Sequence, residues 1–194
     1  MTDFTFYFRL GWEHIISLEA IDHILFLMAL AAVYTLREWK AVLVLVTAFT
    51  IGHSATLALS TLNLLIVPSK LVEFLIPCTI VITAFSNLFQ KAQTPRYIRL
   101  NYFFALFFGL IHGLGFANAL RFMLASDQSL GWALFGFNVG LEAGQILIVI
   151  ALLLIAQAAT TFFKVAKRDW VLFLSAAVFS LAVQLALQRW PGHL

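Results

Sequence analysis

Residues 20–30, AIDHILFLMAL, decide both the fold and the class of function, because Asp22 and His23 open an otherwise apolar run. A charged side chain near the centre of a bilayer costs at least about 2.5–3.5 kcal/mol, so ionisable residues in such runs usually serve a function. Three further apolar segments carry polar groups, at His53, His112 and Glu142. The sequence therefore predicts a helix bundle built round a buried polar site.

The composition indicates a membrane protein. The chain has 194 residues, of which 62% are hydrophobic and 11% charged, whereas soluble domains are about 45–50% apolar and about 25% charged. Apolar runs of about 20 residues recur along the chain and predict an all-α, polytopic membrane helix bundle forming a single domain. We attribute the net charge of +3 to basic loops at the membrane surface and expect no nucleic acid partner.

The apolar pattern predicts about six transmembrane helices. Aromatic residues 4–19 precede the first of them and favour an interfacial or half-inserted segment. Lysine and arginine divide 8 to 4 between the two sets of loops, which predicts both termini outside the cytoplasm and a bacterial inner (cytoplasmic) membrane location. The expected spans are residues 20–36, 41–62, 71–90, 100–124, 132–163 and 170–189.

Three histidines are expected at one depth in the membrane. His23, His53 and His112 each lie 13 or 14 residues from a basic residue at one end of their spans, or roughly 20 Å at about 1.5 Å per residue. Asp22 shares this level, and His14 lies eight residues before it. We expect these side chains to form one site, although histidines in membrane helices also hydrogen-bond across helices.

The donor types favour a divalent transition metal. Imidazole and carboxylate suit Ni, Co, Zn or Fe, whereas Cu(I) prefers Cys and Met. Only Met28 and Met123 lie inside predicted spans, and the single cysteine, Cys78, excludes a thiolate cluster. Asp22 would either ligate the ion directly or orient a histidine.

Other polar residues are candidates for the second shell or the pathway. Thr50 and Ser54 lie one turn apart, near His53. Asn138, Glu142 and Gln145 line one face of the fifth predicted span, next to a glycine stripe typical of close helix contact. Glu142 lies 22 residues before Lys164, about 33 Å, so we expect it farther outward than the histidines, as a gate or a vestibule group.

Several motifs resemble the HupE/UreJ family of membrane proteins between residues 10 and 145: LGWEHI, AIDHILFLMAL, VTAFTIGHSATLALS, VEFLIP, FGLIHGLGFANAL and FNVGLEAGQ. Members accompany hydrogenase and urease gene clusters and are proposed nickel permeases. The DH and GHS motifs also resemble the wider nickel/cobalt permease group. The resemblance implies metal ligation by His14, Asp22, His23, His53, His112 and Glu142. The long gap between His14 and Asp22, and the lack of a histidine-rich N-terminus, leave the metal and the task open.

We expect a permease for a divalent metal ion, with nickel first and zinc or cobalt as alternatives. The competing hypothesis is an intramembrane zinc-dependent hydrolase that uses the same His/Asp cluster, with an open water position on the metal. A metal-sensing or assembly subunit is a third. Besides the lipid bilayer and the ion, the sequence identifies no partner, and it leaves the oligomeric state open, a homo-oligomer included.

Overall fold

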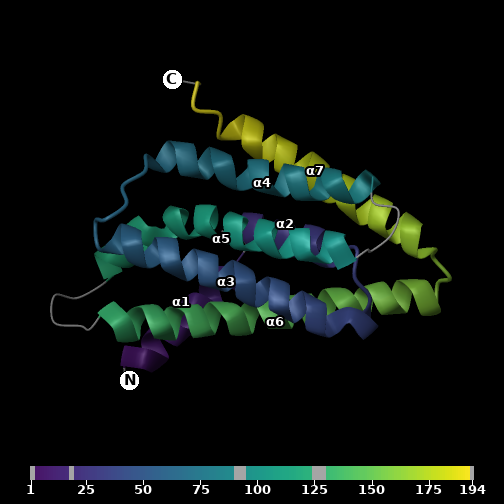
Figure 1. Ribbon diagram of the computed structural model, residues 1–194, viewed down its shortest axis with the longest axis horizontal. Coiled ribbons are helices and arrows are strands. Elements are labelled where there is room, and N and C mark those ends of the chain that lie inside the picture. The colour runs from purple at the N-terminus through teal and green to yellow at the C-terminus, as the bar shows by residue number, and fades with distance from the viewer. Residues whose placement is uncertain (1–2, 18–19, 90–94, 124–129, 193–194) are drawn as a thin grey trace.

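The computed structural model describes residues 3–17, 20–89, 95–123 and 130–192, and all their regular secondary structure is helical. This confirms the predicted all-α class. Figure 1 shows elongated helices stacked side by side, with both termini at the same end of the bundle. In chain order the helices are α1 (Asp3–Ile16), α2 (Ile21–Ala31), the 3₁₀ turn η2 (Leu36–Glu38), α3 (Trp39–Thr61), α4 (Ser69–Phe89), α5 (Pro95–Met123), α6 (Leu130–Thr161) and α7 (Lys167–Gln188).

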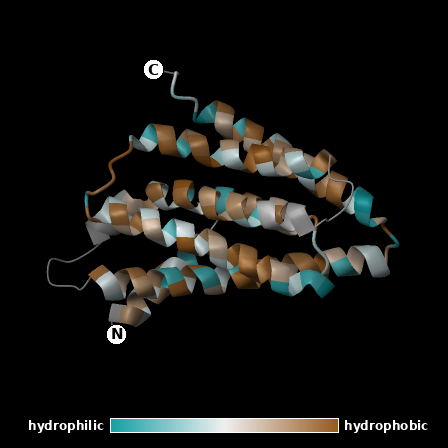
Figure 2. Cartoon of the chain, viewed as in Figure 1, coloured by the Kyte–Doolittle hydropathy of each residue, from teal (hydrophilic) through white to brown (hydrophobic). Residues whose placement is uncertain are grey.

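Four helical stretches of the described chain are long and apolar enough to cross a membrane: Leu36–Thr61, Ser69–Phe89, Leu130–Thr161 and Lys167–Gln188. The bent pair α1 and α2 makes a fifth if it forms one broken span, and α5 adds the shorter apolar stretch Asn101–Ala117. The expected number of about six spans is therefore approximate. Figure 2 shows hydrophobic residues along α4 and α7 and hydrophilic residues where α6 turns into α7.

The first predicted span, residues 20–36, is shorter than expected. Helix α2 ends at Ala31, and a capping box of Thr35 and Glu38 starts the next helical segment. The Glu38 carboxylate accepts hydrogen bonds from the Thr35 backbone N–H at 2.9 Å and hydroxyl at 2.7 Å. The pattern Thr-x-x-Glu is a known helix-start signal, so the sequence contained the cause of this break.

Residues expected to form an interfacial or half-inserted segment form α1, which packs along α6. Tyr7 and Ile15 of α1 are fully buried. The axes of α1 and α2 differ by 70°. This bend places the end of α1 and the start of α2 beside the same group of side chains.

Glycines bring two pairs of parallel helices into backbone contact. A Cβ atom on Gly52 of α3 would overlap the carbonyl of Leu106, and one on Gly109 of α5 would overlap the carbonyl of Phe49. In the same way, a Cβ atom on Gly11 of α1 would overlap the carbonyl of Phe137, and one on Gly140 of α6 would overlap the carbonyl of Phe8. The glycine stripe predicted on α6 thus serves close packing.

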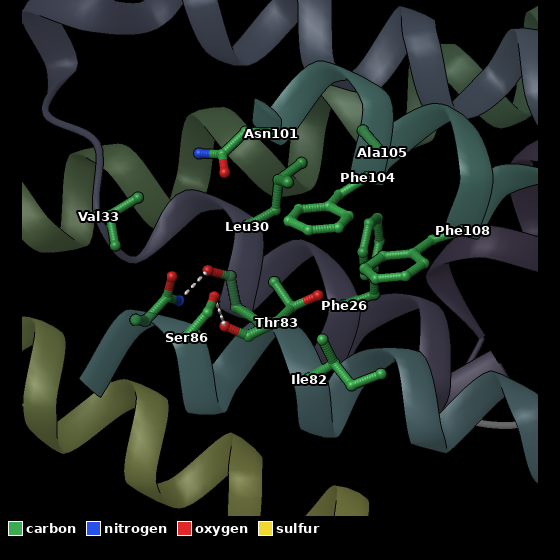
Figure 3. Close-up of a pocket in the computed structure, with 12 residues that line it drawn as sticks. Phe26, Leu30, Val33, Ile82, Thr83, Ser86, Asn101, Phe104, Ala105 and Phe108 are labelled. Atoms are coloured by element: carbon green, nitrogen blue, oxygen red, sulfur yellow. Dashed lines mark hydrogen bonds between the residues drawn. The ribbon is translucent and has the colours of Figure 1, made fainter. Parts of the chain in front are cut away.

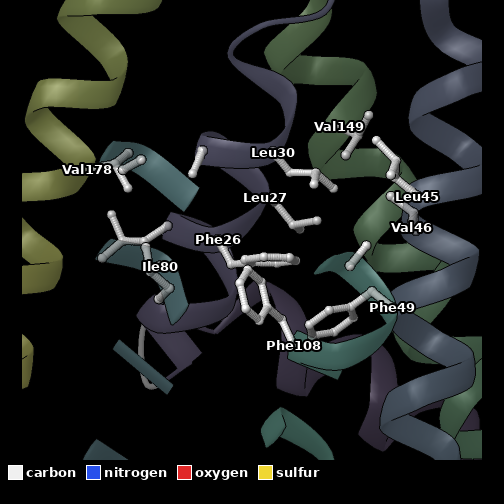
Figure 4. Packing of buried hydrophobic residues seen from close by; sticks show 14 of the residues in the cluster. Phe26, Leu27, Leu30, Leu45, Val46, Phe49, Ile80, Phe108, Val149 and Val178 are labelled. Atoms are coloured by element: carbon white, nitrogen blue, oxygen red, sulfur yellow. The ribbon is translucent and has the colours of Figure 1, made fainter. Parts of the chain in front are cut away.

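The largest apolar core lies between α2 and the helices round it (Figure 4). Phe26 of α2 stacks on Phe49 of α3, with ring centres 4.9 Å apart, and meets Phe108 of α5 edge-on at 6.0 Å. All three rings are at most 3% exposed. This aromatic group, Phe26, Phe49 and Phe108, closes one side of the polar site described below.

Gly109→Ala is expected to lower the unfolding free energy by about 1–3 kcal/mol, the usual cost of forcing atoms into a packed contact. The added methyl group would have to push the backbone at Phe49 away. Thermal unfolding of the purified protein in detergent measures the effect. Gly131→Ala is the matched control, because no neighbouring atom of the described residues lies within 4 Å of its new methyl group. Equal stability of the two variants would contradict the contact.

Candidate metal centre

Four imidazole rings from four helices gather at one place. His23 of α2 is central, with its ring centre 5.0 Å from His14 of α1, 5.0 Å from His112 of α5 and 6.2 Å from His53 of α3. His23, His53 and His112 are at most 5% exposed. The structure thus brings together the four histidines that the sequence singled out.

The ring nitrogens of this cluster are largely unpartnered. Five buried nitrogen atoms have no hydrogen-bond partner within the described residues: Nε2 of His14, Nε2 of His23, both nitrogens of His53, and Nδ1 of His112. The remaining nitrogen of His112, Nε2, lies 3.4 Å from the Thr79 hydroxyl. Buried polar atoms in proteins nearly always have a partner, so the cluster has unused capacity to bind a ligand.

Asp22 holds the central ring in place. Its Oδ1 accepts a hydrogen bond from the His23 backbone N–H at 2.9 Å and lies 3.0 Å from His23 Nδ1. Its Oδ2 lies 3.1 Å from Nη1 of Arg189, beyond the end of α7. A carboxylate on one ring nitrogen fixes the orientation of an imidazole and leaves the other nitrogen for a metal. Asp22 therefore orients His23 in this structure.

Some ring-centre distances in the cluster match those of imidazoles bound to one metal ion, but the nitrogen atoms do not point at a common position. Two imidazoles on one tetrahedral ion, with metal–nitrogen bonds of about 2.0–2.1 Å, have ring centres about 5 Å apart. The pairs His23–His14 and His23–His112 meet this spacing, whereas His23–His53 does not. Among the described residues, no three His, Cys, Asp or Glu side chains are arranged to hold an ion together. Binding would require the rings to rotate.

The cluster is open on one side and closed on the other. A cavity of about 610 Å³ leads to it and is lined by Glu13, His14, Asp22, His23, Glu73, His112 and Arg189, among others. We call this cavity the vestibule. On the other side, the aromatic group separates the cluster from a cavity of only about 20 Å³ between α2, α4 and α5. Figure 3 shows this small cavity, with Thr83 and Ser86 on one wall and Asn101 on another.

Comparison with known proteins identifies the family. Residues 1–190 match the family model described as HupE / UreJ protein, which is nearly the whole chain. The chain belongs to the HupE/UreJ family. Its apolar helices and this membership identify it as an integral membrane protein. No curated protein and no solved structure matches it significantly.

In this HupE/UreJ protein, Glu142 lies outside the histidine cluster and not where we expected it. Its Oε1 accepts a hydrogen bond of 2.6 Å from Thr47, which lies six residues before His53 on α3. Glu142 is therefore nearer the start of α3 than the histidines are, and the predicted outer position is wrong. Helix α6 has 32 residues, about 48 Å at 1.5 Å each, and Figure 1 shows it extending past the start of α3. Counting from Lys164 thus overestimated the depth.

The other predicted pathway residues of the HupE/UreJ protein are mostly engaged with their neighbours. The Ser54 hydroxyl donates to the Thr50 carbonyl at 2.7 Å, and the Thr50 hydroxyl donates to Oε1 of Gln145 at 2.9 Å. Asn138 Nδ2 donates to the Leu134 carbonyl at 2.8 Å, and its Oδ1 has no partner among the described residues. These hydroxyl and amide groups thus pair within and between α3 and α6.

Sequence reasoning missed two contacts of this site. Arg189 was counted only as a basic residue at a helix end, and Thr79 was not considered, yet they contact Asp22 and His112. No local pattern marks either residue, because both contacts depend on how α4 and α7 pack against the other helices.

Thr50→Val is expected to lower the unfolding free energy by about 0.6–2 kcal/mol, the values found for hydrogen bonds between membrane helices. The substitution leaves Oε1 of the fully buried Gln145 without its donor from α3. Thr61→Val is the matched control, because the Thr61 hydroxyl donates to the Leu57 carbonyl within its own helix. Thermal unfolding in detergent compares the two variants. A loss for Thr61→Val as large as for Thr50→Val would contradict the interhelical role.

Proposed function

We propose that this HupE/UreJ protein is a permease for a divalent transition-metal ion, with nickel first and cobalt or zinc as alternatives. The observation that carries the proposal is the set of buried, unpartnered imidazole nitrogens round His23, reached through an open vestibule. Neutral imidazole is a good ligand for all three metals. In this proposal the ion is the transported substrate.

The proposed binding residues are His14, His23, His53 and His112, with Asp22 orienting His23. An ion entering the vestibule first meets Glu13 and Glu73, whose side chains line it, and then exchanges its water for imidazole nitrogens. Transport requires binding that is favourable enough for entry and weak enough for release. Rings that must rotate before they share an ion suit such weak binding. Glu142 is left out of the binding set because Thr47 engages it away from the rings.

Closure of one side is what alternating access requires of a transporter in one of its two end states. The aromatic group lies directly against the cluster, with the ring centre of His112 5.1 Å from Phe49 and 5.5 Å from Phe26. Among the described residues, the vestibule is the cavity that leads to the cluster. We propose that a second conformation moves these rings and releases the ion on the other side. The proposed setting is a bacterial inner membrane with both termini outside the cytoplasm.

His23→Ala and His112→Ala are each expected to reduce nickel transport to background, because each removes ring nitrogens at the centre of the cluster. The measurement is nickel entry into proteoliposomes that contain a metal-sensitive dye, driven by a nickel gradient. His193→Ala, which removes the histidine in the tail of the sequence, is the matched control. Wild-type transport by either cluster variant would contradict the proposal. One tightly retained ion per chain without flux would favour the zinc hydrolase instead.

Nickel affinity is expected to fall as the pH is lowered, because protons compete with the metal for the same imidazole nitrogens. A ligand with the pKa of free histidine, about 6.5, would weaken binding about tenfold between about pH 7.5 and about pH 5.5, so we expect at most this change for each ring that takes up a proton. Isothermal titration of the purified protein measures the dissociation constant at each pH. Circular dichroism at both values shows that the fold is kept. Binding that becomes tighter as the pH is lowered would contradict this competition.

A further inference from the structure

Arg189 places a positive charge inside the proposed entrance for cations. It follows α7 directly and reaches a residue 167 positions earlier in the chain, with Nη1 3.1 Å from Oδ2 of Asp22. The side chain is 27% exposed, and that of Asp22 is 11% exposed. Since Arg189 and Asp22 both line the vestibule, the guanidinium meets the carboxylate within the proposed entrance.

This ion pair neutralises the site when no metal is bound. Oδ1 of Asp22 is engaged by His23, and Oδ2 is engaged by Arg189. A divalent ion among the imidazoles would be repelled by the guanidinium, and this repulsion is stronger in a partly buried setting than in bulk water. Metal and guanidinium therefore compete for the same carboxylate.

The vestibule offers Arg189 a second position. Its Nη1 already lies 3.5 Å from the backbone carbonyl of Glu73 on α4. The side chain of Glu73 is exposed and lines the same cavity. A rotation of the arginine side chain toward α4 would exchange a buried carboxylate for an exposed one. The charged group would stay paired throughout, so the exchange leaves no buried charge alone.

We propose that the Arg189 guanidinium occupies Asp22 when no metal is bound, and that an entering divalent metal ion displaces it from this carboxylate. This inference rests on the proposed function and adds a positioning residue that sets how tightly the site binds. When the metal leaves, the guanidinium returns to Asp22 and opposes rebinding. Arg189 thus weakens binding and speeds release.

The test is isothermal titration of nickel chloride into the purified full-length protein in detergent. Arg189→Gln is expected to bind nickel about tenfold more tightly than wild type, because the competing charge is gone. Arg189→Lys keeps the charge and is expected to stay near wild type. Arg37→Gln is the matched control, since Arg37 is exposed and is not one of the described residues that line the vestibule. In an Asp22→Asn background, where no carboxylate holds the guanidinium beside the rings, Arg189→Gln should give a smaller gain.

Chemical rescue separates displacement from a merely structural role. Arg189→Ala leaves space in the vestibule for free guanidinium, which at millimolar concentration should weaken nickel binding by this variant and leave wild type unchanged. Should Arg189→Ala fail to fold, Arg189→Gln and Arg189→Lys still decide the question. Equal nickel affinity of wild type and Arg189→Gln would overturn the inference alone. Absence of nickel binding by every variant, wild type included, would overturn the proposed function and the inference together.

Discussion

Direct backbone contact between parallel helices is the constraint on which the site depends. Gly52 and Gly109 let α3 and α5 touch, and His53 and His112 lie within three residues of these glycines. Gly11 does the same for α1 against α6, three residues before His14. Because a helix sets the direction of each side chain, fixing the contact also fixes where these rings point. Membrane helices use small residues in this way because van der Waals packing is a main source of their attraction.

A second constraint is the buried carboxylate of Asp22. An uncompensated charge at this depth would be costly, and Asp22 meets this cost with His23 on one oxygen and Arg189 on the other. The same two contacts connect α2 to the end of α7 and hold the central imidazole in one orientation. The two carboxylate oxygens of Asp22 therefore affect both the packing of the helices and the orientation of the central imidazole. Under the proposed function, rearranging this one ion pair would change the affinity of the cluster for its ion.

The difference between the two sides of the cluster gives the molecule a direction. Polar and charged groups line the vestibule, whereas Phe26, Phe49 and Phe108 pack against each other on the other side. The small cavity bordered by Thr83, Ser86 and Asn101 lies on the far side of this aromatic packing, between α2, α4 and α5. Under the proposed function, that is where an opening to the other side would form.

The sequence by itself determined the helical class, the membrane setting, the family and the residues worth examining. Composition, apolar length and ionisable residues in apolar runs are local properties, so no coordinates were needed for them. The local sequence also contained a helix-start signal after Ala31, the capping box of Thr35 and Glu38, although the apolar run continues past Ala31. Only the tertiary structure decided that Arg189 meets Asp22 and that Glu142 lies with Thr47, away from the rings. Both depend on the lengths, crossing angles and relative heights of packed helices, which residue counting along straight spans does not capture.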